Sequence, residues 1–475
     1  MVAWGVMFRR SRVVDLEPAR RALAQGQYDV AFAILEDAAR GGFARAAQAQ
    51  YWLHLAAVYA LYAEDGVENG VPALRSAVTA DPNLADDALY RALYWEFAAY
   101  RGGSVGDVKR GIRQVPARAE AVAGYHAASA LLAAGAPKSA AKRLLLLPVA
   151  ELPVYLVWRR WSLLGQSREA LGDWSGAAEA FRDAVELAPE AERDPERLSL
   201  AGALLELADP QAALSELARV DEEALRPEER AVLRYLSGRA HLESGNPNLA
   251  LSLLREARAL EGDRPGPDAG FQTALATAQA LVALGRFGEA TEAFAAALAV
   301  APAEDRPYVQ HEAAYALIES DALTAAEAML SEVVSDPTYP HRAEALADLA
   351  DTRLKSGELD GAEVLARQAL EMGATAAACL CLGNIAYEYF RLDEAISWFE
   401  QAVSASQPGD PVWVGAQQLL ADAYAWSGEA MAERVLTHAR LALDHTEPSS
   451  EWYLPLRRHL AAAQKILGGH DRLLN

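Results

Sequence analysis

The chain has 475 residues, of which 52% are hydrophobic and 23% charged, and its formal net charge is −22. This composition is typical of a folded, soluble protein and argues against long disordered stretches. The negative charge argues against a protein generally coated with nucleic acid. Two cysteines rule out a disulfide framework, and no apolar run approaches the roughly 18 residues that span a bilayer. We expect a soluble cytoplasmic protein without membrane insertion, and the excess of arginine over lysine hints at a bacterial source.

Residues 1–11 are expected to form an N-terminal extension before the first helix. Their apolar part is too short for a signal sequence, and the positive charge follows it rather than preceding it. The native start is either Met1 or Met7, and the choice does not affect the rest of the interpretation.

An alanine recurs along the chain at spacings of 33 to 40 residues. The residue four positions later is always apolar, and the residue five positions earlier is a glycine or another small residue, with Phe390 as the exception. A fixed period of this length predicts an array of stacked helix pairs. The series consists of Ala140, Ala177, Ala213, Ala250, Ala290, Ala325, Ala362, Ala395 and Ala432.

The clearest unit lies between Trp158 and Ala191. Trp161, Leu164 and Gly165 share one face of a predicted first helix, which Gly172 ends. Asp173 is placed to cap a second helix. The inward face of that helix is predicted to consist of Ala177, Phe181 and Ala184, and Pro189 prevents its continuation.

This unit resembles the tetratricopeptide repeat (TPR) family. Arg168 stands where the family usually has a tyrosine. Units 271–305 and 376–408 match the pattern too, whereas the 306–342 unit has Glu332 where a small residue is expected. The match is strong over residues 121–437 and weaker outside them. In the repeat at 158–191, the resemblance is carried by Trp161, Leu164, Gly165, Gly172, Ala177, Phe181, Ala184 and Pro189.

The resemblance implies an all-α fold, a right-handed α-solenoid of about twelve antiparallel helix hairpins. We expect degenerate TPR-like hairpins over 12–120, a regular array over 121–449, and a capping helix and tail over 450–475. The segment 261–269 is interpreted as a surface loop or a local loosening of the array. The hairpins are expected to begin near residues 12, 51, 85, 121, 158, 194, 231, 271, 306, 343, 376 and 413.

No motif of catalysis stands out in the sequence. A Walker loop, a zincin motif, a nucleophile elbow and a dinucleotide fingerprint are all missing. The histidines at 438, 445, 459 and 470 have spacings that put them on different faces. We therefore expect no enzymatic activity, no metal and no cofactor.

Basic residues gather in one part of this acidic chain. Residues 101–160 hold ten Lys and Arg against Asp107, Glu120 and Glu151. Near Trp158 and Trp161, such a patch would suit an acidic peptide or, less readily, nucleic acid, but the favoured interpretation is a solvated basic face over core tryptophans. The predicted patch consists of Lys109, Arg110, Arg113, Arg118, Lys138, Lys142, Arg143 and Arg160.

Aromatic residues are unevenly distributed as well. Residues 387–453 hold ten of them, whereas 182–386 hold only seven. The extra rings are either surface anchors for a partner or larger core fillers in less regular repeats.

The TPR resemblance also implies that the first helices line a concave groove. We predict a protein–protein interaction scaffold or adaptor that binds a partner protein or peptide there, an acidic segment being one candidate. The alternative is a nucleic-acid-associated repeat protein that uses the basic, aromatic-flanked region 101–161, and self-association stays open. A clamp for a terminal carboxylate is not expected, since it needs a lysine beside the asparagine. The groove candidates are Tyr125, Arg159, Gln166, Glu169, Tyr235, Arg239, Gln279, Gln310, Asp351, Asn384 and Tyr387.

Overall fold

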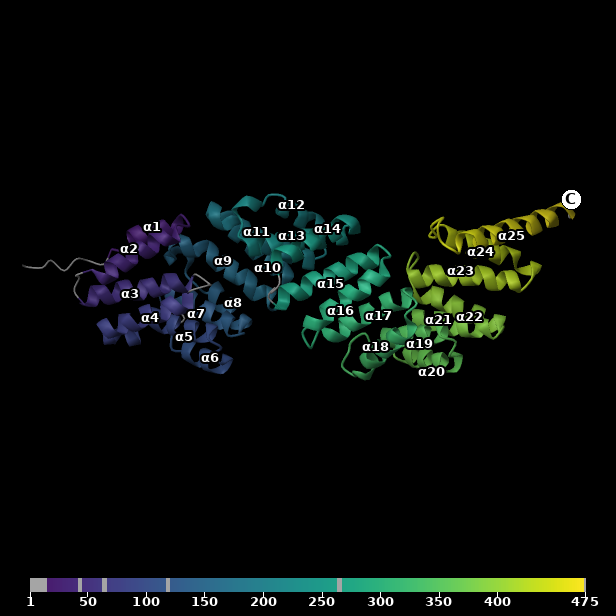
Figure 1. Cartoon of the computed structure of the whole chain (residues 1–475), viewed down its shortest axis with the longest axis horizontal. Coiled ribbons are helices and arrows are strands. Elements are labelled where there is room, and N and C mark those ends of the chain that lie inside the picture. The colour runs from purple at the N-terminus through teal and green to yellow at the C-terminus, as the bar shows by residue number, and fades with distance from the viewer. Residues whose placement is uncertain (1–14, 42–44, 62–65, 117–119, 263–266, 474–475) are drawn as a thin grey trace, which may run out of the picture. The chain divides into compact units, whose positions relative to one another are not determined.

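The computed structural model describes residues 15–41, 45–61, 66–116, 120–262 and 267–473 (Figure 1). These residues form twenty-five α-helices and four short 3₁₀ helices, and they contain no strand. The chain divides into two compact units, Met1–Gly262 (unit 1) and Asp263–Asn475 (unit 2). The division falls in the predicted loop 261–269, of which residues 263–266 lie outside the described part.

Unit 1 consists of consecutive helix hairpins. The 3₁₀ helices η1 (Pro82–Asp86), η2 (Val149–Glu151) and η3 (Glu222–Ala224) lie in its connections. The hairpins are α1 (Glu17–Ala24) with α2 (Tyr28–Arg40), α3 (Arg45–Ala60) with α4 (Gly66–Ala80), α5 (Ala88–Tyr100) with α6 (Val105–Ile112), α7 (Ala121–Ala133) with α8 (Pro137–Leu145), α9 (Val154–Glu169) with α10 (Trp174–Leu187), α11 (Glu190–Glu206) with α12 (Pro210–Leu217), and α13 (Pro227–Glu243) with α14 (Pro247–Glu261).

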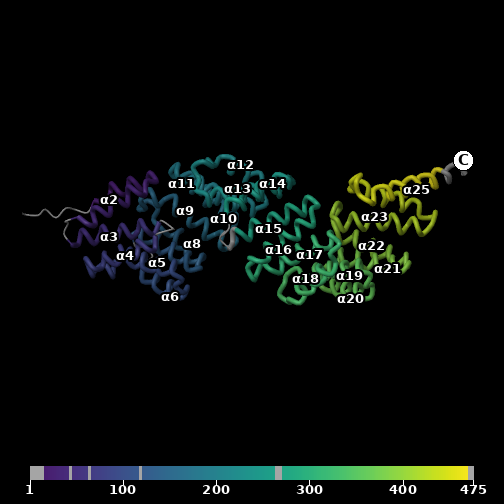
Figure 2. The backbone as a smooth tube through the Cα atoms, viewed as in Figure 1, coloured from purple at the N-terminus to yellow at the C-terminus, as the bar shows by residue number. Residues whose placement is uncertain are grey.

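Unit 2 continues the same pattern and ends with a single long helix (Figure 2). The 3₁₀ helix η4 (Glu429–Met431) precedes its last hairpin helix. The hairpins are α15 (Pro267–Ala283) with α16 (Phe287–Val300), α17 (Arg306–Glu319) with α18 (Leu323–Ser335), α19 (Arg342–Lys355) with α20 (Leu359–Glu371), α21 (Thr375–Glu388) with α22 (Leu392–Ala405), and α23 (Pro411–Trp426) with α24 (Ala432–Leu443), followed by α25 (Tyr453–Leu473).

Within each unit, the hairpins pack so that their first helices touch one another. Successive helices are in contact, and in unit 1 α3 also contacts α5, α5 contacts α7, α7 contacts α9 and α11 contacts α13. In unit 2 the same holds for α17, α19, α21, α23 and α25. The first helices therefore form a layer on which the second helices pack. The predicted all-α array of helix hairpins is confirmed, whereas its right-handed winding stays a prediction.

The two helices of a hairpin meet at small residues. A Cβ atom added at Gly165 of α9 would lie 2.6 Å from the ring of Phe181 on α10, and Gly383 meets Phe399 in the same way. At Gly238, the added atom would lie 2.8 Å from Leu254 and 3.3 Å from the carbonyl oxygen of Ala250. Such contacts leave room for hydrogen only, so the crossings depend on glycine and alanine.

The clearest predicted hairpin, α9–α10, also shows how the chain replaces the usual tyrosine. Asp173 caps α10, since its side chain accepts a hydrogen bond from the Gly176 amide at 3.1 Å. The guanidinium of Arg168 donates to the carbonyl oxygen of Gly176 at 2.7 Å. Arg168 therefore ties the end of α9 to the first turn of α10 by a polar bond.

The alanine series is correct in all repeats but one. In α18, Ala325 is exposed, and the buried residues are Ala326, Leu330 and Val333. The register is therefore shifted by one residue, and Val333 rather than Glu332 occupies the inward position. The spacing of alanine and apolar residue fits both registers, because Ala325 and Ala326 are identical and both are followed four positions later by an apolar residue. The misfit of Glu332 was the sequence signal for the shift.

The turns inside the hairpins explain the glycines that precede the alanines. Gly172 has a φ of +72°, a left-handed conformation that glycine adopts without strain. Phe390, the exception in the sequence pattern, adopts the same conformation with a φ of +56° and is 82% exposed. The turn geometry is therefore conserved within the chain even where glycine is missing.

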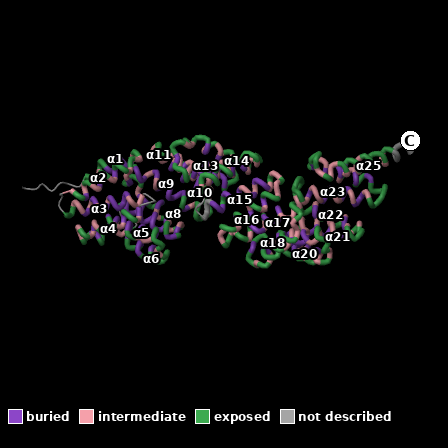
Figure 3. The backbone as a smooth tube through the Cα atoms, viewed as in Figure 1, coloured by how far each residue is buried: buried purple, intermediate pink, exposed green. Residues whose placement is uncertain are grey.

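The last helix, α25, packs on the end of unit 2 as the capping helix was expected to do. Leu456 and Ala463 are buried against α23 and α24, while most of the described side chains of α25 are exposed or half-buried (Figure 3). In the described part of the chain, no helix combines the length and apolar character that crossing a membrane requires. The predicted domain limits at 11/12, 120/121 and 449/450 stay predictions.

Replacing Ala326 by leucine should destabilise unit 2 by about 1 to 3 kcal/mol, because the larger side chain overpacks the α17–α18 contact. The same change at exposed Ala325 should alter the free energy of unfolding by less than about 0.5 kcal/mol. Urea unfolding followed by circular dichroism measures both. Equal effects at the two positions would contradict the shifted register.

Replacing Phe390 by glycine should stabilise unit 2 by about 1 kcal/mol, since glycine removes the strain of the left-handed turn. The ring is mostly exposed, so little packing is lost. The control is the neighbouring Tyr389→Gly, where φ is −81° and glycine should destabilise instead. A lower melting temperature for Phe390→Gly would show that the ring stabilises the turn.

Candidate functional site

Polar side chains of neighbouring first helices pair with one another in unit 1. Arg239 of α13 bonds Glu206 of α11 at 2.8 Å and Glu243 of its own helix at 3.1 Å. The Ser162 hydroxyl of α9 donates to Glu196 of α11, also at 2.8 Å. These partners are about one repeat apart in the sequence. Residues placed toward the predicted groove therefore join repeats to each other.

The structure gives the predicted groove residues of unit 1 different environments. Gln166 and Glu169 of α9 are exposed, and Tyr235 and Arg239 of α13 are half-buried. Tyr125 is buried, which is a correction to the list of accessible residues. The cause is that every residue of α7 from Ala121 to Leu131 is buried, as expected for a helix that is almost entirely apolar.

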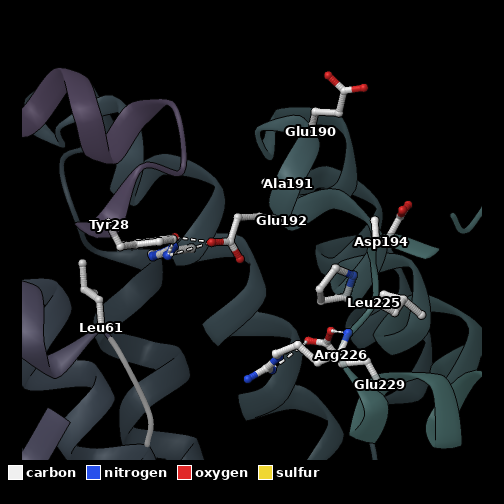
Figure 4. A pocket seen from close by; sticks show the side chains of 12 residues that line it. Tyr28, Leu61, Glu190, Ala191, Glu192, Asp194, Leu225, Arg226 and Glu229 are labelled. Atoms are coloured by element: carbon white, nitrogen blue, oxygen red, sulfur yellow. Dashed lines mark hydrogen bonds and ion pairs between the residues drawn. The ribbon is translucent and has the colours of Figure 1, made fainter. Parts of the chain in front are cut away.

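The N-terminal hairpin covers another predicted groove residue. Arg159 of α9 donates a hydrogen bond to the hydroxyl of Tyr28 on α2, and this hydroxyl donates to Glu192 of α11 (Figure 4). The guanidinium also lies 3.6 Å from the Glu192 carboxylate and over the ring of Trp158. Arg159 thus joins three hairpins of unit 1 and is largely used within the fold.

This junction borders a pocket of about 460 Å³ between α2, α9, α11 and the start of α13 (Figure 4). Three of its four acidic side chains, Glu192, Asp194 and Glu229, already have partners. Asp194 pairs with Arg197 at 2.6 Å, and Glu229 pairs with Arg226 at 2.7 Å. The pocket is therefore best explained as a structural junction between hairpins that are far apart in the sequence.

The predicted basic patch does not form a single surface. Arg160 is buried, with its Nε donating to the carbonyl oxygen of Leu144 at 2.9 Å and its guanidinium over Trp161. Trp158 is buried and Trp161 is half-buried. The assignment of Arg160 to an exposed patch is thus wrong, because this side chain joins α9 to α8. Arg118 lies outside the described residues.

The exposed part of the patch lies on α6 and α8. Arg110 pairs with Asp107 at 3.1 Å, and Lys138 is exposed on the first turn of α8. The remaining predicted members, Lys109, Arg113, Lys142 and Arg143, line one groove with a volume of about 380 Å³.

In unit 2, acidic and aromatic side chains follow the layer of first helices. Tyr308 and Tyr315 are exposed on α17, and Trp426 is 68% exposed on α23. Between them lie carboxylates of α19, α21 and α23 that are exposed or half-buried. We call this the acidic–aromatic face. It consists of Tyr308, Tyr315, Asp348, Asp351, Asn384, Tyr387, Glu388, Asp422 and Trp426.

Hydrogen bonds between helices hold this face together at two points. His311 of α17 bonds Asp348 of α19 through Nε2 at 2.9 Å and the Tyr339 hydroxyl through Nδ1 at 2.9 Å. Asp422 of α23 accepts from the Tyr387 hydroxyl of α21 and from Nε2 of His459 on α25 at 2.9 Å. The His459 bond is the main cause that lowers the pKa of Asp422, so its carboxylate stays ionised at neutral pH.

Of the predicted groove residues in unit 2, Asp351, Asn384 and Tyr387 lie on this face, while Gln279 of α15 bonds Glu312 at 2.9 Å. Gln310 is buried and donates to Glu332, which is a correction to the accessible set. It follows from the one-residue shift in this repeat, which turns His311 toward the groove instead.

Sequence reasoning missed Tyr308, Tyr315 and Trp426 as surface residues. The excess of aromatics over 387–453 was a signal for Trp426, but it did not distinguish exposed rings from buried ones such as Phe399 and Trp413. In the described part of the chain, no group of three or more His, Cys, Asp or Glu is arranged to hold a metal ion. Cys379 and Cys381 are both buried.

Glu196 predicts a pH dependence of stability in unit 1. Burial raises its pKa from 4.5 to about 7, and its Oε2 is buried without a hydrogen-bond partner. The protonated Glu196 side chain makes its full contribution to the stability of the fold below about pH 4.5, and this contribution is lost as the pH rises through 7. Glu196→Gln should therefore gain about 3 kcal/mol relative to the wild type between pH 4.5 and pH 8. Urea unfolding of both proteins at each pH tests this, and a pH-independent difference would contradict it.

Comparisons with known proteins give structural similarity only. No protein-family model matches the chain, and no curated protein matches it in sequence. The crystal structure of the APC/C hetero-tetramer Cut9-Hcn1 is similar over 94% of this chain and 95% of that chain, with 15% identity and a TM-score of 0.43. PilF of Pseudomonas aeruginosa has 17% identity and a TM-score of 0.36, covering 49% of this chain and 98% of its own.

PilW, a widely conserved type IV pilus biogenesis factor, has 17% identity and a TM-score of 0.37, covering 48% of this chain and 97% of its own. At these identities and scores, no partner or activity is transferred to this chain. The hairpins themselves pair as the sequence resemblance implies, with Gly165 against Phe181 and Gly383 against Phe399. In its fold, the chain is an all-α array of tetratricopeptide-like helix hairpins.

Proposed function

We propose that the chain is a non-catalytic protein-interaction scaffold whose acidic–aromatic face holds a basic segment of a partner protein. The observation that carries the proposal is Trp426. Its indole is 68% exposed on α23, one turn after the ionised Asp422, which accepts a hydrogen bond from Tyr387 of α21. An exposed aromatic ring beside a carboxylate suits the side chain of arginine or lysine, which can lie over the ring while it pairs with the acid.

Charge over the whole unit favours the same partner. Unit 2 carries 31 Asp and Glu against 14 Lys and Arg. On the face itself, Lys355 pairs with Asp351 at 3.1 Å, whereas Glu388 at the end of α21 is exposed. A negative surface of this kind attracts a basic segment during encounter and disfavours an acidic one.

The face is also held in place before any partner arrives. The bond from His311 to Asp348 joins α17 to α19, and the bond from Tyr387 to Asp422 joins α21 to α23. His459 connects Asp422 to the capping helix α25. Side chains held in this way lose little conformational entropy on binding.

A selection from a random 12-residue peptide library against the full-length chain tests the proposal. We expect enrichment of peptides with several arginines or lysines. Trp426→Ala and Glu388→Lys should each weaken their binding by about fivefold to tenfold in fluorescence anisotropy, which corresponds to about 1 to 1.4 kcal/mol. Added salt should reduce the contribution of Glu388 in particular.

The chain offers a matched control for the charge change. Glu371 and Glu388 are both exposed glutamates that end a helix, but Glu371 lies on the second helix α20. Glu371→Lys should change peptide affinity by less than twofold. Enrichment of acidic or purely apolar peptides, or equal losses for both lysine variants, would rule out a basic segment at this face.

A further inference from the structure

Unit 1 contains a second surface of opposite charge, the groove between α6 and α8. Its volume is about 380 Å³, and it is lined by Lys109, Ile112, Arg113, Leu131, Ser139, Lys142, Arg143 and Leu146. Arg143 of α8 is tied to the segment that follows α6, because its Nη2 donates to the carbonyl oxygens of Val115 and Pro116 at 3.0 Å each. This bridge holds the end of α6 beside α8 and gives the groove its shape.

The positive charge in the groove is not neutralised within the described part of the chain. Lys109, Arg113 and Lys142 have no ion pair among the described residues, and no carboxylate is part of the lining. Many other basic residues of unit 1 are paired, as Arg110 is with Asp107 and Arg197 with Asp194. Converging cations without acidic partners are unusual in a chain with a net charge of −22.

The groove also offers apolar surface beside these cations. Ile112 and Leu131 are buried at its base, while Leu146 is 62% exposed and the adjacent Leu145 is 55% exposed. An exposed leucine in the lining, Leu146, indicates a place where a partner's apolar side chain can be buried. Such burial contributes about 25 cal/mol per Å² of apolar surface.

The lining favours a peptide over nucleic acid. No aromatic side chain is part of it, whereas the binding of single-stranded nucleic acid relies on bases stacking on aromatic rings. The tryptophans that made region 101–161 a candidate for nucleic acid pack against Arg159 and Arg160 inside unit 1. Aliphatic contacts and cations together fit carboxylates that alternate with apolar residues.

We propose that the α6–α8 groove is a docking site for an acidic peptide segment of a partner, with carboxylates on Lys109, Arg113 and Lys142 and an apolar side chain against Leu146. The site lies between second helices of unit 1, and it is independent of the acidic–aromatic face of unit 2. The chain then binds two segments of opposite charge at separate places.

Fluorescence anisotropy of the full chain with a labelled peptide of alternating glutamate and leucine tests this site. Lys109→Glu combined with Arg113→Glu, and Lys142→Glu alone, should each weaken binding at least tenfold. Leu146→Ser, which leaves the charge unchanged, should weaken it about threefold, and a peptide with serine in place of leucine should bind that variant and the wild type equally. Lys138→Glu is the matched control on α8, because Lys138 is exposed but outside the groove, and it should change the affinity by less than twofold.

Circular dichroism melting curves verify that each variant is folded, and Leu146→Ser tests the site even if the charge reversals destabilise α6. Unchanged binding of the acidic peptide in the groove variants would overturn the proposal. So would a single-stranded DNA 12-mer that binds through Lys109 and Arg113 more tightly than the peptide does. Dimerisation that is lost in these variants, without peptide binding, would show that a second copy of the chain occupies the groove and would also overturn it. Glu388→Lys should not affect this assay, so failure here is distinct from failure of the proposed face in unit 2.

Discussion

The structure depends on how closely the two helices of each hairpin approach one another. At Gly165 and Gly383 there is space for a hydrogen atom only, because a phenylalanine ring of the second helix fills the remainder. A hairpin packed in this way still leaves one apolar face open, so it needs a neighbour on that side. The next hairpin supplies this neighbour throughout each unit, and at the end of unit 2 α25 supplies it with Leu456. The small residues thus determine both the repeat period and the need for a capping helix.

Stacking at this distance also brings the polar side chains of the first helices together. Arg239 with Glu206, Ser162 with Glu196, and Tyr387 with Asp422 each connect helices that are one repeat apart. A polar residue at a groove position can therefore serve to join two repeats without contacting any partner. Rings that stay exposed beside these pairs, such as Trp426 and Tyr315, are better candidates for partner contact than the half-buried members of the pairs.

The fold was predictable from the sequence because its main determinant is local and periodic. Glycine in the turn and alanine after it recur with the period of the hairpin, so the helix pairs could be located within a few residues. The period alone did not distinguish Ala325 from Ala326, and the only sequence signal for the second register was Glu332 at a position where the first register needs a small residue. The residue type at position 390 did not predict a left-handed turn either, because phenylalanine rarely adopts a positive φ. Only the glycines at the same position of other repeats indicate that geometry.

The site was less predictable because its contacts are not periodic. Arg159 meets Tyr28, which lies 131 residues earlier, and no local pattern indicates that the N-terminal hairpin folds over α9. Arg160 looked like part of a basic surface because it follows Arg159 and stands beside Trp161. In a helix, adjacent residues point in different directions, and here one of them enters the contact with α8. Counting charges along the sequence therefore overestimates the size of the exposed basic patch. Its accessible part is the groove on α6 and α8.

The α6–α8 groove satisfies the hydrogen bonds of a charged group without cancelling its charge, because Arg143 donates to two backbone carbonyl groups. On the acidic–aromatic face, Asp422 accepts bonds from the neutral Tyr387 hydroxyl and from His459, whereas Glu388 stays exposed. The paired residues elsewhere differ, since Arg239 lies between Glu206 and Glu243 and its charge is compensated by theirs. A neutral hydrogen-bond partner fixes the position of a side chain but leaves its electrostatic attraction directed at solvent. This difference separates the charges that hold the repeats together from those that remain available to a partner.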